Sequence, residues 1–213
     1  MPADTVPDMT ARDIPDGLPT EWLSTDEARE LLAQPSHRSA PRLLGGEITG
    51  PDGVVLRVVE VEAYGSGDDP ASHAHRGPTA RNGAMFGVVG SLYAYRSYGI
   101  HTCLNIVSHP SGSAGGILLR AGEVVAGHSA AVRGREDLSP VQWASGPGRL
   151  GTALGYPLSD SGRELLAADL LRIRRSAASD IATGPRIGIS RAKEQPWRFW
   201  LPGHPAVTRY RSG

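Results

Sequence analysis

Residues 54–64, VVLRVVEVEAY, form the stretch that decides the fold. They follow Asp52-Gly53, a dipeptide typical of hairpin turns, and so predict a strand paired with residues 47–49. Side chains of a strand alternate between its two faces. The odd-numbered positions from 55 onward are mostly apolar and predict a face directed toward the core. The opposite face is expected to carry Val58, Glu60, Glu62 and Tyr64.

The rest of the chain predicts further short elements around this strand. A helix is expected to begin at Ser24, because Ser24 and Glu27 have the spacing of a capping box. The alternating segments 92–97 and 101–107 predict two paired strands joined around Tyr98. Other expected elements are a long polar loop at 65–87, strands at 115–120 and 170–174, a turn and helix at 145–155, and a closing strand pair of 186–189 with 197–201.

Composition indicates a globular chain that is rich in turns. Its 213 residues include 27 Gly and 17 Pro, which favour short strands over long helices. This length suits one domain with a substantial core. We therefore predict the α+β fold class, with a mobile acidic leader at 1–22 and a single domain at 23–213. The single cysteine, Cys103, excludes an intramolecular disulfide and is expected to be a small buried residue.

Charge is unevenly distributed, although the formal net charge is zero. Residues 1–30 carry a net charge of −6 and residues 31–213 a net charge of +6. A basic body is compatible with phosphate binding, and we hypothesise that the acidic leader screens it. The sequence has neither a signal-peptide pattern nor an apolar stretch long enough to cross a membrane. We therefore expect a cytoplasmic protein without a membrane partner.

Glu60 and Glu62 are the first candidates for chemistry. At this spacing on one strand, one carboxylate can raise the pKa of the other, which suits a general base. The alternative is that both are solvated on an exposed sheet face. Tyr64 on the same face favours the first interpretation, because an aromatic ring beside a carboxylate builds a partly dry pocket.

Tyrosines form the second candidate group. Tyr93 and Tyr95 share a strand face, and packing in a core or interface would explain them equally well. Tyr98 is different, because it lies beside Gly99 in the expected turn, where a large ring packs poorly. A ring on an exposed tip is suited to wedging between stacked bases.

Histidines and a glycine-rich turn complete the candidates. His73 and His75 invite a metal hypothesis, but the sequence lacks a Cys/His cluster with metal-ligand spacing. A histidine that lines a pocket and hydrogen-bonds a substrate is the favoured interpretation. The turn at 146–149 could offer backbone N–H groups to a phosphate or be a plain turn.

Taken together, these residues resemble the alkyladenine (3-methyladenine) DNA glycosylase family of base-excision enzymes. The resemblance covers most of residues 40–205 and excludes the leader. Departures are modest: Val88-Val89 stand where many relatives have prolines, and Ile100 stands where some have methionine. The matching stretches are VVEVEAYGSGDDPASHAHRG, RNGAMFG, LYAYRSYGIHTCLNI, ILLRAGEVVAG, SGPGRLGTALG, GPRIGIS and WRFWLPG.

The resemblance implies a role for each matching residue. Glu62, rather than Glu60, matches the general base that activates water, and Arg120 matches the arginine that helps to hold that water. Tyr98 matches the residue that intercalates into the duplex. Asn105 matches the position that disfavours the exocyclic amino group of guanine. The flipped base is expected between Tyr64, His73 and Tyr95.

The implied protein is a monomeric, monofunctional glycosylase that starts base excision repair on double-stranded DNA containing alkylated or deaminated purines. Its fold is expected to be a strongly curved sheet with a protruding β-hairpin and short surrounding helices. No cofactor or metal is expected, and the enzyme would associate with the nucleoid through DNA. A Schiff-base route needs an amine, and Lys193 is the only lysine. Two alternatives are a non-catalytic module that binds damaged DNA or RNA and a carbohydrate-active hydrolase.

Overall fold

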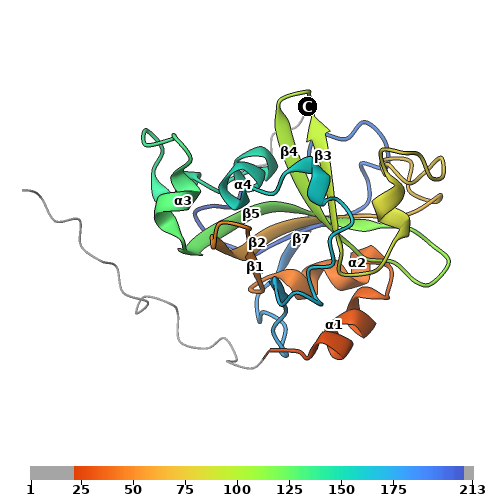
Figure 1. The fold of residues 1–213 in the computed structure, drawn as a ribbon. Helices are drawn as coiled ribbons and strands as arrows, with labels where there is room; N and C mark the ends of the chain where they lie inside the picture. Colours follow the sequence, from red (N-terminus) through yellow and green to blue (C-terminus); the bar gives the residue numbers. More distant parts are fainter. Residues whose placement is uncertain (1–21, 209–213) are drawn as a thin grey trace, which may run out of the picture.

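The computed structural model describes residues 22–208, which form a single domain around a curled antiparallel sheet (Figure 1). The order of the strands is β3-β4-β5-β2-β1-β6, and β8 pairs with both β2 and β7. The α+β prediction is therefore confirmed. The strands are β1 (Glu47–Thr49), β2 (Val55–Tyr64), β3 (Leu92–Ser97), β4 (His101–Val107), β5 (Gly116–Ala126), β6 (Leu171–Arg172), β7 (Ala182–Gly184) and β8 (Arg198–Trp200).

Short helices cover the sheet. Helix α2 packs on β2, and α4 packs on β4 and β5, so that Figure 1 shows the α1–α2 and α3–α4 pairs below and above the sheet. The core between these elements is aliphatic, with fully buried side chains such as Leu56, Leu104 and Leu119. The helices are α1 (Thr25–Leu32), α2 (Ser36–Ser39), α3 (His128–Val132) and α4 (Pro147–Leu154), with 3-10 turns η1 (Ala40–Leu43), η2 (Gly83–Phe86), η3 (Pro140–Gln142) and η4 (Leu158–Asp160).

Local sequence signals placed the first elements correctly. Ser24 caps α1 through the Glu27 amide, and the Glu27 carboxylate accepts from the Ser24 amide, as a capping box requires. Gly53 adopts a left-handed φ of 76° in the turn between β1 and β2. Trp22, the last residue of the predicted leader, forms a β-bridge with Arg174. The remainder of that leader lies outside the described residues, so its mobility stays a prediction.

Strand β2 departs from the simple alternation that its sequence predicts. The register against β5 shifts between Val58 and Glu60, which marks a β-bulge. Val58 consequently packs in the main core with Val61, whereas Val59 packs with Ala121 in a separate cluster. The prediction that Val58 shares a face with Glu60 is wrong, because the bulge inserts one unpaired residue between them.

The predicted strand pair near the C-terminus is partly wrong. Strand β8 forms within the predicted segment 197–201, but its partners are β2 and β7 rather than residues 186–189. Arg186 and Ile187 instead direct hydrogen bonds to acidic side chains, Asp69 and Glu62 respectively. The segment is thus held by side chains and not by a strand ladder.

The β3–β4 hairpin has the predicted bounds and protrudes from the sheet (Figure 1). Its turn residue Tyr98 has a positive φ of 49°, followed by Gly99 at 71°. Among the residues that the structure describes, no helix is long and apolar enough to cross a membrane.

Candidate active site

A cavity of about 480 Å³ opens beside the hairpin and holds most of the predicted site residues. It is bounded by strands β2 to β5 and by the segment 187–191. The residues of the site that line it are Tyr64, His73, Tyr95, Tyr98, Asn105 and Arg120. Six of the seven predicted site residues therefore converge on one cavity.

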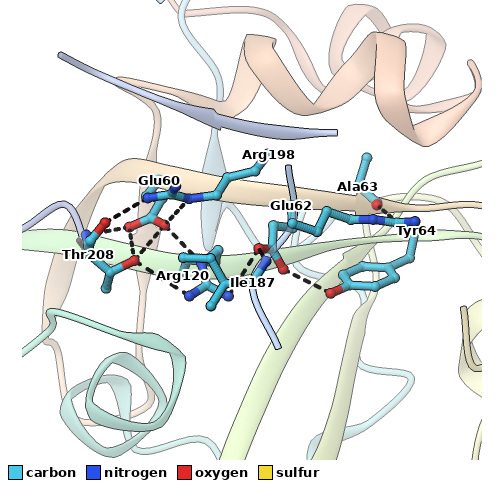
Figure 2. Close-up of polar contacts among 9 residues, drawn as sticks. Glu60, Glu62, Ala63, Tyr64, Arg120, Ile187, Arg198 and Thr208 are labelled. Atoms are coloured by element: carbon cyan, nitrogen blue, oxygen red, sulfur yellow. Dashed lines mark hydrogen bonds and ion pairs between the residues drawn. The ribbon is translucent and has the colours of Figure 1, made fainter. Parts of the chain in front are cut away.

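Glu62, the seventh, lies immediately behind the cavity wall with 0% of its surface exposed. Its Oε2 accepts a hydrogen bond from the Tyr64 hydroxyl at 2.8 Å, and its Oε1 accepts from the Ile187 amide at 2.6 Å. Arg120 adds an ion pair, with 3.2 Å between Nη1 and Oε1 (Figure 2). All three partners line the cavity, so Glu62 is the carboxylate nearest to whatever occupies it.

Glu60 is equally buried but belongs to a different set of contacts. Its Oε1 accepts from Arg120 Nε at 2.8 Å and from Arg198 Nε at 2.7 Å (Figure 2). Burial alone would raise the pKa of Glu60, but Arg120, the Thr208 donors and Arg198 together lower it. Glu60 is therefore an ionised structural partner of Arg120. The hypothesis that either glutamate is a solvated surface group is wrong, since both are completely covered.

Arg120 links the two carboxylates from the neighbouring strand β5. Its pKa is raised, because Glu62 and Glu60 outweigh the effect of burial. The guanidinium is consequently a permanent cation, and Arg120 both lines the cavity and contacts Glu62 through Nη1. A carboxylate and a cation at 3.2 Å can together bind and polarise a water molecule.

Tyr64 lines the cavity, and the guanidinium of Arg186 packs against its ring and holds it in place. The Arg186 guanidinium lies 4.7 Å from the centre of the Tyr64 ring and 5.2 Å from that of Trp197. Arg186 is itself held by Asp69 at 2.7 and 2.9 Å, and neither partner is exposed. Burial and the adjacent Glu62 raise the pKa of Tyr64 well above its ordinary value, so the phenol remains a donor.

His73 and Tyr95 also line the cavity, and their rings contact each other edge to face. Their ring centres are 4.6 Å apart and nearly perpendicular. His73 Nδ1 also shares a hydrogen bond with the Tyr93 hydroxyl at 2.9 Å. Burial and Arg81 lower the pKa of His73, which keeps the imidazole neutral at pH 7. A neutral ring can donate or accept one hydrogen bond toward a bound heterocycle.

Asn105 is a buried polar side chain on β4 that lines the cavity. Its Nδ2 donates to the Tyr93 carbonyl at 3.1 Å, which fixes the orientation of the amide. Because the side chain is locked, it can exclude a substituent by its bulk. That Asn105 disfavours guanine stays a prediction.

Tyr98 and Ile100 form an apolar tip on the hairpin. The exposed fractions are 89% for Tyr98 and 70% for Ile100, the two largest among the exposed apolar side chains of the described chain. Tyr98 also reaches the edge of the cavity. An exposed ring beside an aromatic cavity is placed to enter a gap in stacked bases.

Several residues of the site were not predicted. Ile187 holds Glu62, Arg186 supports Tyr64, and Arg198 and Thr208 hold Glu60. They lie more than a hundred residues from their partners, so no local pattern could reveal them. Within the described part of the chain, no cluster of three or more His, Cys, Asp or Glu side chains could hold a metal ion.

The arrangement is a cavity lined by aromatic side chains, next to a buried carboxylate and a permanent cation, as in enzymes that act on flat heterocycles. Comparison with known proteins makes this specific. The methylpurine-DNA glycosylase (MPG) family model matches residues 30–205, and the chain belongs to this family. Family membership makes the chain a DNA glycosylase of the DNA repair type.

Bacterial relatives match more than four-fifths of the chain. A protein of Rhodococcus jostii (strain RHA1) is 44% identical over 87% of this chain and 88% of its own length. A protein of Nocardia farcinica (strain IFM 10152) is 49% identical, with 85% and 90% covered, and one of Corynebacterium efficiens is 48% identical, with 82% and 92% covered. Each bears the name "Putative 3-methyladenine DNA glycosylase".

Proposed function

We propose that this protein flips alkylated or deaminated purines out of duplex DNA and hydrolyses the N-glycosidic bond with a water activated by Glu62. Base excision repair would begin with this step. The observation that carries the proposal is a cavity lined by Tyr64, Tyr95 and Arg120, with Glu62 paired to Arg120 directly behind the wall. A base inside a stacked duplex cannot reach such a cavity, so the nucleotide must leave the stack.

The surroundings of the cavity favour DNA as the substrate. The residues lining this cavity and the adjoining one of about 400 Å³ include Arg76, Arg81 and Arg191. Within the described chain, no aspartate or glutamate lines either cavity. Cationic walls of this kind attract the phosphates that flank a flipped nucleotide. Tyr98 would fill the vacated space in the duplex and offset part of the cost of flipping.

Aromatic walls and His73 would select the base. Tyr64 and Tyr95 would stack on the extruded ring, and a cationic alkylated purine gains additional attraction from aromatic faces. Neutral lesions such as hypoxanthine are poorer leaving groups and need a hydrogen bond to the departing ring. The neutral His73 is the candidate donor. Asn105 would exclude guanine through its fixed amide.

The chemical step would use Glu62 and Arg120 together. A water at the cavity end of Arg120 would contact Glu62 once their 3.2 Å ion pair lengthens. Glu62 would take the proton of this water as it attacks C1′, and its charge would stabilise the oxocarbenium-like sugar. The departing base would leave through the cavity, and an abasic site would remain in the strand.

We infer that the protein does not cut the strand. A lyase needs an amine that forms a Schiff base with the sugar. Lys193 is exposed and does not line either cavity, although Arg191, two residues earlier, does. Scission by the wild-type protein would contradict this inference, and scission that survives both Lys193→Ala and a blocked N-terminus would contradict the Schiff-base argument. We further infer that the enzyme acts as a monomer on the DNA of the nucleoid.

A labelled duplex tests the proposal directly. Its strand carries one ethenoadenine, hypoxanthine or 7-methylguanine and is incubated with the wild-type protein and with Glu62→Gln. Breaks that appear only after hot alkali, and that Glu62→Gln loses, are the expected result. No excision of any of the three bases would instead favour a module that binds nucleic acid without catalysis. Hydrolysis of simple glycosides would point to a carbohydrate-active enzyme.

A further inference from the structure

Glu60, which has no role in the proposed chemistry, is the centre of a buried cluster. Its carboxylate accepts from two arginines, Arg120 and Arg198, and from one threonine, Thr208. The Thr208 amide donates to Oε2 at 2.7 Å, and the Thr208 hydroxyl lies 2.7 Å from Oε1 and 2.9 Å from Oε2. Four donor groups therefore saturate one carboxylate that water cannot reach.

Cross-contacts among its partners close the cluster. Arg198 Nη2 donates to the Thr208 carbonyl at 2.6 Å, and Arg120 Nη2 lies 3.5 Å from the Thr208 hydroxyl. The partners come from β5, from β8 and from the segment that follows β8, whereas Glu60 lies on β2. Three separate parts of the chain thus meet at one side chain (Figure 2).

The contacts of Arg120 with the two carboxylates differ in length, and the difference indicates which one holds the guanidinium in place. Its Nε makes a 2.8 Å hydrogen bond to Glu60, whereas its Nη1 makes a longer 3.2 Å ion pair with Glu62. A planar guanidinium that is fixed at Nε and Nη2 still presents Nη1 in a defined direction. Arg120 therefore does not depend on Glu62 for its place, and a water can come between the two without releasing the arginine.

The charges of the cluster also indicate that Arg120 does not depend on Glu62 for its place. The cluster of Glu60, Glu62, Arg120 and Arg198 contains two carboxylates and two guanidinium groups. Glu60 contacts both cations, so Arg198 supplies part of the charge that Glu60 requires. Without Arg198, the single positive charge of Arg120 would have to serve two buried anions.

We propose that Glu60 and Thr208 are positioning residues, which hold Arg120 so that its Nη1 keeps the attacking water against Glu62. This inference rests on the roles proposed above for Glu62 and Arg120. Thr208 lies outside the segment that the family model matches and is the last residue that the structure describes. The active site is thereby extended to a part of the chain that shows no motif.

Thr208→Val provides the main test, because it removes only the hydroxyl and keeps the amide that donates to Glu60. Single-turnover excision from a duplex with one ethenoadenine is measured with enzyme in excess, together with the Kd for an uncleavable duplex. We expect the rate to fall about tenfold, the worth of one hydrogen bond to a charged group, while Kd changes less than about twofold. Thr208→Ser keeps the hydroxyl and should restore the rate.

Matched controls separate positioning from a general loss of structure. Thr183→Val makes the same change on β7, and Glu123→Gln removes a carboxylate on β5 that pairs with Arg57 and is 46% exposed. Neither should alter the rate. In an Arg120→Gln background, Thr208→Val should have no further effect, because both residues act through the same guanidinium.

The outcomes separate this inference from the proposed function. If the wild-type protein excises the base and Thr208→Val does so at the same rate, the inference is wrong and the function stands. If Thr208→Val slows excision equally in the Arg120→Gln background, Thr208 does not act through Arg120, and the inference is again wrong. If the wild-type protein excises no damaged base, the proposed function fails first.

Discussion

Glu60 and Glu62 stand two residues apart on β2, both are 0% exposed, and both contact Arg120, yet their surroundings differ completely. Glu60 is saturated by two arginines and Thr208, away from the cavity. Glu62 contacts a phenol, a backbone amide and Nη1 of Arg120, and all three of these residues line the cavity. Burial does not distinguish a structural carboxylate from a reactive one. The distinction comes from the hydrogen-bond partners of each carboxylate and from whether a cavity adjoins it.

Replacing each glutamate with glutamine should produce two different defects, one mainly in catalysis and one mainly in stability. Glu62→Gln should lower single-turnover excision by about 10²–10⁴-fold, the range that general base catalysis contributes. The Kd for damaged duplex should change little. The thermal midpoint should fall less than in Glu60→Gln, since Glu62 makes one ion pair of 3.2 Å whereas Glu60 makes two shorter ones, and glutamine retains an oxygen that can accept from Tyr64. Excision by Glu62→Gln within threefold of the wild-type rate would remove Glu62 as the general base.

Glu60→Gln should instead show its largest effect in stability. Removing one charge from a buried cluster leaves its partners unpaired and costs about 3–5 kcal/mol. Urea unfolding of wild type, Glu60→Gln and Glu62→Gln under identical conditions gives the comparison. Glu123→Gln is the control, because its ion pair with Arg57 is partly exposed and is worth less than about 1 kcal/mol. Equal stability of Glu60→Gln and wild type would contradict a structural role.

The difference in stability between wild type and Glu60→Gln should also depend on pH. The pKa of Glu60 is lowered in the folded state, so its contribution to stability is present above its unfolded pKa and is lost as pH falls through the folded one. Glutamine does not titrate. The difference in unfolding free energy between wild type and Glu60→Gln should therefore shrink below about pH 4 and stay constant from pH 5 to 8. Urea titrations across this range measure it, and a difference that grows on acidification would reverse the sign of the argument.

The features that could be predicted from the sequence depend on residues close to one another in the chain. The capping box at Ser24, the turn at Gly53 and the hairpin around Tyr98 are all set by residues within a few positions of one another. The resemblance to a known family, rather than spacing, singled out Glu62 over Glu60. The structure gives a physical reason for that choice, because Glu62 contacts three residues that line the cavity, whereas Glu60 contacts only one of them, Arg120.

Other features could not be predicted, because they depend on contacts between distant segments. The bulge at Val58–Glu60 arises from pairing with β5 and changes which valines enter the core. Arg186 contacts Asp69, 117 residues earlier in the chain, and this ion pair holds the segment 186–189, for which a strand was predicted. A local pattern carries no information on such partners.

The smallest predicted effect concerns the hairpin tip, which contacts neither carboxylate and so separates DNA engagement from chemistry. Tyr98→Ala removes an exposed ring, whose stacking on a base is worth about 1–3 kcal/mol, while Tyr98→Phe keeps it. We expect Tyr98→Ala to weaken binding of damaged duplex about tenfold and leave the thermal midpoint unchanged, because no core contact is lost. Fluorescence anisotropy with duplex and with a damaged single strand measures this. Since an unpaired base needs no gap to be filled, the loss should be confined to the duplex, and equal losses on both substrates would show that Tyr98 stacks without wedging.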